Sequence, residues 1–296
     1  MKLNYVTKIE CNLKNYKRIH TKKMTTRILD GSYKSVYKGR SMNFEDIRDY
    51  VAGDDIKDVD WKASARSRKL LVRQYIAEKK HNIMLVMDTN KRMLADTDKS
   101  FEKREIALMG AGTLAYLVNQ NGDYISSTYA IDIIGDKDKN TSINHTPFRT
   151  GLTNLESILQ GYHKAVTPKN NSNMDDVLNY IARSFRSRMI LVVVTDIEGI
   201  NEISESTLKR ILRLNDVLFI NVKSAKLDGG KAFDVRDESY LPDFFAKDKK
   251  LIKLQHDSFS QMDMNCINKL KKYGIAMASI EDMEGLDDNI IKLLHR

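Results

Sequence analysis

The chain has 296 residues, of which 42% are hydrophobic and 30% charged, and this balance is typical of a folded globular protein. Its longest apolar runs, residues 82–87 and 189–195, are about seven residues long, whereas a transmembrane helix needs about 20. Cys11 and Cys266 are the only cysteines, which argues against a disulfide framework. Because the amino terminus also lacks the pattern of a secretion signal, we expect a cytoplasmic protein.

The net charge of +9 is concentrated at the amino terminus. Residues 1–40 contain eleven Lys and Arg against Glu10 and Asp30, so the remaining residues are balanced in charge. We therefore expect no nucleic-acid binding by the body of the protein. The apolar residues of this segment recur every three to four positions, which predicts an amphipathic helix. Such a helix could dock by its apolar face, or residues 1–27 could attach the protein peripherally to the inner face of the membrane. These apolar residues are Ile9, Leu13, Tyr16 and Ile19.

Residues 31–80 differ in pattern from the rest of the chain. They carry Gly31, Gly39 and Gly53 and an alternating stretch, Leu70–Ile76, which predicts a small extended subdomain ending near residue 80. The sequence thus divides into a basic helical segment (1–30), this subdomain (31–80) and a larger domain (81–296).

From residue 82 onward, short apolar runs alternate with longer helical patterns. This alternation predicts a three-layer α/β fold with a mostly parallel sheet covered on both faces. The predicted strands are 82–88, 124–134, 189–196, 216–222 and 275–280, and the predicted helices are 99–120, 153–165, 174–186, 205–214, 260–273 and 286–294.

Common enzyme motifs are incomplete or missing. The segment Ala225–Ala232 (AKLDGGKA) lacks the first glycine and the final Ser or Thr of a phosphate-binding loop, so we expect a turn there. The six histidines have no metal-ligand spacing, and HExxH, GxSxG and CxxC motifs are missing. We therefore predict a protein that is not an enzyme and has no organic cofactor.

Three consecutive blocks between residues 39 and 66 are dense in charged, aromatic and glycine residues. They read GRSMNFEDIRDY (39–50), GDDI (53–56) and VDWKASAR (59–66), and in this order they resemble the domain-of-unknown-function 58 family. We expect Trp61, the only tryptophan, to be a buried anchor. The cluster could lock the subdomain in place through ion pairs, or it could be a docking surface for a partner protein. Its residues are Arg48, Tyr50, Gly53, Asp54, Asp55, Asp60, Trp61 and Arg66, with Arg48 and Arg66 expected to pair with the aspartates.

The carboxyl-terminal part of that family resembles a von Willebrand factor type A domain, which implies a metal-ion-dependent adhesion site. Asp88 matches the first aspartate of its D-x-S-x-S motif, but Asn90 and Arg92 stand where serines are expected. Asp196 would supply the later aspartate, and Ser172, or secondarily Thr153, the loop hydroxyl. This degenerate site could hold Mg²⁺, or Arg92 could replace the ion by pairing with Asp88 or Asp196.

The resemblance implies a non-enzymatic, protein-binding adaptor. Its implied partner is a MoxR-type AAA+ ATPase, with which it would mature other proteins in a chaperone-like manner. The alternatives are a membrane-surface scaffold held by the basic helix and a hydrolase that uses the carboxylates at the edge of the sheet.

Overall fold

The structure, a computed structural model, describes residues 4–19, 43–76, 80–97, 101–132, 141–225, 233–234, 239–240 and 248–294. Residues 20–42 and the expected turn at 226–232 lie outside the described residues. The chain divides into two compact units: residues 1–29 with 81–296 form the larger one, and residues 30–80 form the smaller one.

The larger unit is built on a six-stranded sheet with the strand order β10-β7-β6-β3-β4-β5. Neighbouring strands are parallel, except that β5 is antiparallel to β4. The central strands β3 and β6 are almost entirely apolar and buried, as expected for parallel strands covered on both faces. The predicted α/β fold with a mostly parallel sheet is confirmed. The strands are Asn82–Met87 (β3), Tyr124–Asp132 (β4), Thr141–His145 (β5), Ile190–Thr195 (β6), Asp216–Val222 (β7) and Ala276–Ile280 (β10).

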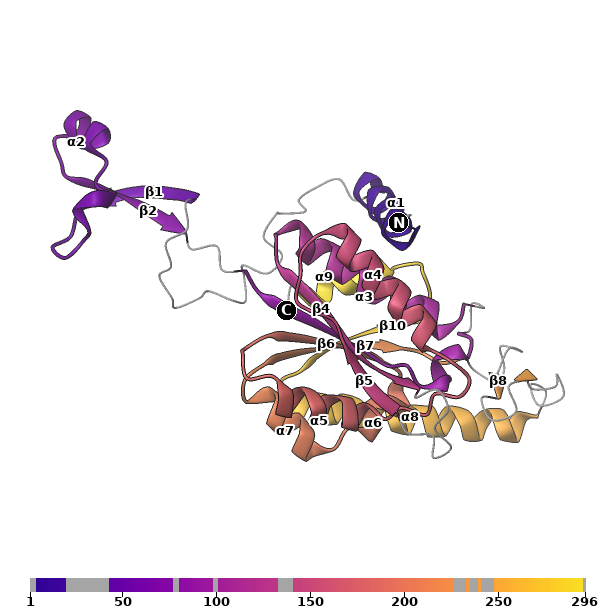
Figure 1. Cartoon of the computed structure of the whole chain (residues 1–296). Coiled ribbons are helices and arrows are strands. Elements are labelled where there is room, and N and C mark those ends of the chain that lie inside the picture. Colours follow the sequence, from indigo (N-terminus) through magenta and orange to yellow (C-terminus); the bar gives the residue numbers. More distant parts are fainter. Residues whose placement is uncertain are drawn as a thin grey trace. The chain divides into compact units, whose positions relative to one another are not determined.

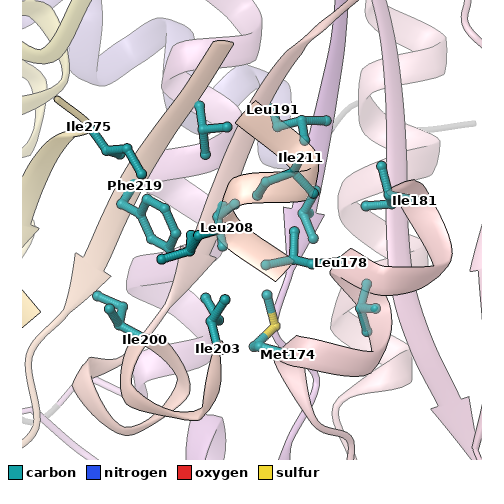
Figure 2. Packing of buried hydrophobic residues seen from close by; sticks show 14 of the residues in the cluster. Met174, Leu178, Ile181, Leu191, Ile200, Ile203, Leu208, Ile211, Phe219 and Ile275 are labelled. Carbon is teal, nitrogen blue, oxygen red and sulfur yellow. The ribbon is translucent and has the colours of Figure 1, made fainter. Parts of the chain in front are cut away.

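Helices cover both faces of the sheet (Figure 1). Helices α3, α4 and α9 lie on one face, and α5, α6, α7 and α8 lie on the other. Figure 2 shows the core beneath the second face, where Leu191 and Phe219 of the sheet pack among Leu178 of α5 and Leu208 of α7. The helices are Lys103–Gln120 (α3), Leu152–Ala165 (α4), Met174–Ser184 (α5), Ile197–Glu202 (α6), Glu205–Leu212 (α7), Lys249–Lys272 (α8) and Leu286–Leu294 (α9).

The amino-terminal helix α1, Asn4–Ile19, is packed into the larger unit rather than separate from it. Its apolar face lies against α3 and α4, where a Cβ on Gly112 would come within 2.5 Å of Ile9 Cδ1. The buried carboxylate of Glu156 on α4 accepts the backbone N–H groups of residues 4–6 at 2.9–3.2 Å and so caps the first turn of α1. The basic segment therefore contributes to the α/β core. The buried residues of this face are Val6, Ile9 and Leu13.

The smaller unit is an antiparallel pair of strands, β1 (Asn43–Asp49) and β2 (Leu71–Ile76). The predicted extended stretch at 70–76 is present as β2, but the connection contains the short helices η1 (Ile56–Asp58) and α2 (Trp61–Ser67). The Asp60 carboxylate caps α2 by accepting two N–H groups of its first turn, at 3.0 and 3.1 Å.

Several elements of the larger unit were not predicted, among them the antiparallel pair of two-residue strands β8 (Phe233–Asp234) and β9 (Ser239–Tyr240). Helix α6 has six residues, too few for a helical period to stand out. Strand β5 is a short edge strand of polar sequence, TSINH. Helix α8 begins eleven residues before the predicted start at 260, because its first half is mostly exposed and polar. Among the helices in the described residues, none is long and apolar enough to cross a membrane.

Candidate functional site

Asp88 and Asp196 follow the central strands β3 and β6 at their carboxyl ends. The chain leads from β3 to β4 on one side of this point and from β6 to β7 on the other, so the strand order diverges here. Open α/β sheets bind ligands at such a position. The structure thus brings the two predicted aspartates together, with both side chains buried.

The Asp88 carboxylate is held by hydrogen bonds from its own chain. Its Oδ2 accepts the Thr195 hydroxyl at 2.6 Å, and its Oδ1 accepts the Asn90 N–H at 2.9 Å. Burial raises the pKa of Asp88; the guanidinium of Arg92 opposes this rise, and the charge of Asp196 adds to it.

Asp196 is paired with a lysine that the sequence pattern did not reveal. Lys103 is the first residue of α3, and its Nζ lies 2.9 Å from Asp196 Oδ2, with only 4% of the lysine side chain exposed. Burial alone would raise the pKa of Asp196, but Lys103, Arg92 and the Gly199 N–H together hold this pKa below its usual value. A lysine at the start of a helix opposes the helix dipole. Because the sequence predicts a helix that begins at residue 99, this placement of Lys103 becomes apparent only in the structure.

Arg92 lies between the two aspartates and the acidic side of α6. Its Nη2 is 3.3 Å from Asp88 Oδ2, its Nε is 3.7 Å from Asp196 Oδ1, and its Nη1 pairs with Glu202. The Nε also lies 3.7 Å from Glu198, and the Arg92 side chain is only 15% exposed. Four carboxylates thus share two cations. We call this set the strand-end network: Asp88, Arg92, Lys103, Asp196, Glu198 and Glu202.

The other residues that were predicted to bind a metal ion are Asn90 and Ser172, and both interact with other groups of the protein instead. Asn90 Oδ1 caps η2 (Lys91–Leu94) by accepting the Arg92 N–H at 3.0 Å, and its Nδ2 donates to Ser172 O at 2.8 Å. The Ser172 hydroxyl, which is buried, lies 3.3 Å from that of Thr89. Thr153 is not brought to the site, since its neighbour Asn154 bonds to Ile125 O at the opposite, amino end of β4.

The residues present do not fit the divalent cation that the resemblance implies. Magnesium requires about six oxygen ligands, whereas nitrogen atoms of Arg92 and Lys103 face the two aspartates at 3.3 and 2.9 Å. The amide oxygen of Asn90 already accepts a backbone N–H. Across the described residues, His, Cys, Asp and Glu form no group of three or more that could hold a metal ion.

Gly199 allows helix α6 to approach the strand-end network. A Cβ at this position would lie 2.0 Å from Thr195 Oγ1 and 2.9 Å from Asp88 Oδ2. Both distances are too short for a non-bonded contact, so any residue other than glycine would clash. The glycine thus lets the first turn of α6 donate to Asp196 at 2.9 Å. This role depends on tertiary contact and has no local sequence signal.

In the smaller unit, part of the predicted cluster forms structural pairs. Arg48 binds Asp54 through two hydrogen bonds of 2.7 Å each, and Gly53 adopts a φ of 109° in the turn between them. Asp55 caps η1, and Tyr50 N–H donates to Leu70 O at 2.9 Å. These residues fix the backbone of the small unit.

The remaining residues of that cluster are exposed. The prediction that Trp61 is a buried anchor is wrong: its side chain is 63% exposed. The side of α2 toward β2 carries Ser64 instead, whose hydroxyl accepts the Leu71 N–H at 2.8 Å. Arg66 is also exposed, and it does not pair with Asp60, whose carboxylate is bound by Arg73 at 2.9 Å.

Comparison with known proteins gives a family match over residues 46–228, to the family described as Protein of unknown function DUF58. Similar curated proteins are uncharacterized proteins of Mycobacterium bovis and Mycobacterium tuberculosis. Each is 25% identical over 176 residues, which cover 58% of this chain and 52% of the relative. The chain therefore spans about half the length of the curated relatives it matches.

Three solved structures are similar to the chain. A von Willebrand factor type A protein from Catenulispora acidiphila has a TM-score of 0.41 at 8% identity, over 76% of this chain and 43% of that one. The pilus adhesin SpaC from Lactobacillus rhamnosus GG has a TM-score of 0.39 at 9% identity, over 73% and 29% of the two chains. The SpRpn10 VWA domain has a TM-score of 0.36 at 10% identity, over 72% and 94%.

Proposed function

The chain belongs to the DUF58 family, and on that premise we propose that it is a non-enzymatic adaptor that binds a partner protein through its smaller unit. The partner that we propose is a MoxR-type AAA+ ATPase, and together the two proteins would mature other proteins.

The observation that carries this proposal is the exposure of large apolar side chains in the smaller unit. Of the nine such side chains exposed in the described residues, four lie between residues 51 and 70. Backbone hydrogen bonds hold three of them near one another, since Tyr50 bonds to Leu70 and Asp60 bonds to Leu71. Clustered exposed apolar residues mark protein-binding surfaces. The four residues are Val51, Ile56, Trp61 and Leu70.

The strand-end network supports a binding role over hydrolysis. A hydrolase would need a carboxylate free to take or give a proton at the substrate. Both oxygens of Asp88 and of Asp196 instead interact with hydrogen-bond donors or cations of the chain. These contacts favour a charge-balanced structural role for the two aspartates.

The packing of α1 bears on the membrane-surface alternative. An interfacial helix binds a bilayer by burying its apolar face among the lipids. In α1 that face is buried against α3 and α4, and Ile9 is fully buried. Among the side chains of α1 that the structure describes, Lys8 and Lys14 are the exposed cations that could contact anionic lipids.

Binding of the purified protein to a MoxR-type ATPase from the same organism tests the proposal. Ile56→Ser should weaken binding about tenfold, because it removes a large exposed apolar side chain from the proposed binding surface. Leu254→Ser on α8 is the matched control, because both side chains are 66% exposed. Lack of binding by the wild type, or equal losses in the two variants, would contradict the proposal.

A further inference from the structure

One side of helix α2 in the smaller unit combines the tryptophan with several cations. Trp61 and Ala65 are four residues apart, as are Lys62 and Arg66, so the four share one side of the helix. Ser64, the buried residue of α2, lies away from them. Arg68 and Lys69 directly follow the helix. All six are exposed, and we call them the α2 face: Trp61, Lys62, Ala65, Arg66, Arg68 and Lys69.

Most cations of the α2 face have no acidic partner. Within the described residues, Lys62, Arg66 and Arg68 make no ion pair, and Lys69 is 3.7 Å from Asp49 with both side chains largely exposed. In contrast, Arg48 and Arg73, elsewhere in the same unit, are bound to aspartates at 2.7 and 2.9 Å. The local acidic residues thus satisfy the structural arginines and leave the α2 face positive.

Arg68 occupies a position that favours glycine. It ends α2 with a φ of 57°, the only positive φ of a non-glycine residue in the described part of the chain. Helices commonly end in this conformation with glycine, because a side chain makes it unfavourable. An arginine here is therefore not explained by the stability of the turn.

We propose that the α2 face binds a carboxylate-rich surface of the partner protein, an inference that rests on the proposed adaptor function. Arginine can form two parallel hydrogen bonds with a carboxylate, and an exposed tryptophan supplies a large apolar contact at the centre. The face is thus suited to an acidic patch that also carries apolar side chains.

The surrounding charges favour a protein over a nucleic acid or an anionic membrane. Asp55 is exposed, Asp58 and Asp60 are half-buried, and Asp60 directly precedes Trp61. A nucleic acid with a base stacked on Trp61, or a membrane into which Trp61 inserts, would bring a continuous array of phosphates close to these carboxylates and be repelled. A protein surface can match the mixed pattern with its own cations.

Trp61 allows the face to be observed directly, because it is the only tryptophan in the chain. The full-length protein would be titrated with an acidic copolymer of glutamate and lysine, in which glutamate is in excess and tryptophan is missing, while the emission of Trp61 is recorded. Equal charge concentrations of a single-stranded oligonucleotide and of phosphatidylglycerol vesicles serve as competing ligands. We expect the acidic copolymer, whose lysines can meet the neighbouring aspartates, to change the emission at the lowest concentration, and the effect to weaken as salt screens the charges.

Two variants separate binding from folding. Arg66→Glu should weaken binding of both the acidic copolymer and the ATPase about tenfold, whereas Lys253→Glu, at an exposed position of α8, should change neither. Arg68→Gly should weaken binding while leaving the melting temperature unchanged or higher, because glycine suits the positive φ.

Two results would overturn the inference: a stronger response to the oligonucleotide or the vesicles, or unchanged binding by Arg66→Glu and Arg68→Gly. If the ATPase binds but these variants have no effect, the α2 face is wrong and the adaptor function stands. If the acidic copolymer binds as predicted but the ATPase does not, the face is correct and the proposed partner is wrong.

Discussion

The pair between Lys103 and Asp196 can be tested by replacing the lysine with methionine. The side chains are of similar length, so Lys103→Met removes the charge and leaves the Asp196 carboxylate buried with weaker compensation. At 2.9 Å the pair's attraction is about 6 kcal/mol at an effective dielectric constant of 20. Part of this attraction offsets the cost of removing the two charges from water, and breaking a buried pair typically costs about 3–5 kcal/mol of stability. We expect a loss of that size, a large share of the stability of a domain.

Urea unfolding at neutral pH measures this loss as a shift of the midpoint with an unchanged slope. Lys253→Met, at an exposed position on α8, is the control and should change stability by less than about 0.5 kcal/mol. Adding Asp196→Asn to Lys103→Met removes the buried charge that has lost its closest cation, so the double variant should lose less stability than the sum of the two single losses.

The pH dependence gives a second test of the same pair. The lowered pKa of Asp196 stabilises the wild type above the unfolded-state pKa of about 3.9, and this stabilisation is lost as the pH falls through the lower, folded-state value. Without Lys103, the pKa of Asp196 should rise, so protonation of Asp196 should stabilise the folded variant as the pH falls from 7 toward 4. The difference in unfolding free energy between the wild type and the variant should therefore become smaller. Asp88, whose raised pKa acts in the opposite sense, is present in both. A gap below about 1 kcal/mol that does not change with pH would refute this account.

Four further outcomes are expected. Calorimetric titration with magnesium or manganese should show no micromolar binding to the wild type, since the strand-end network supplies its own cations. Gly199→Ala should lower the free energy of unfolding by about 1–3 kcal/mol or more, because the new methyl group would overlap the Thr195 hydroxyl. Trp61→Ala should cost less than about 0.5 kcal/mol, as expected for an exposed side chain, and a larger loss would show that it is packed. In the native protein, a thiol reagent at pH 8 should modify exposed Cys11 but not Cys266, whose pKa burial raises to about 11; urea should release the second thiol.

The fold was predictable because its signals are local. The apolar runs at β3 and β6 and the helical periods between them recur over enough residues to indicate buried strands and covering helices. Asp88 and Asp196 were singled out by the family resemblance, and their positions at the carboxyl ends of two parallel strands supported that choice, because such ends meet at one edge of a sheet. Strand β5 and helix α6 were missed, because a short polar strand and a six-residue helix contain too few apolar residues to show a hydrophobic period.

The chemistry of the site was less predictable, because it depends on contacts between distant residues. Arg92 was expected to neutralise the aspartates, since it stands where the family motif has its second serine. Lys103 is separated from Asp196 by 93 positions, and only the packing of α3 brings them together. The exposure of Trp61 was likewise not visible in composition, because it depends on which side of α2 meets β2.

The capping of α1 by Glu156 has a consequence for the order in which the protein can form. The partners of this contact are about 150 residues apart, and the whole smaller unit lies between them in the chain. During synthesis, α1 leaves the ribosome long before α3 and α4, so its apolar face stays exposed to solvent until these two helices have been made. The smaller unit, whose strands are close in sequence, can fold in that interval without them. Protection of α1, by a chaperone or by the ribosome itself, is thus most needed while residues 103–165 are still being made.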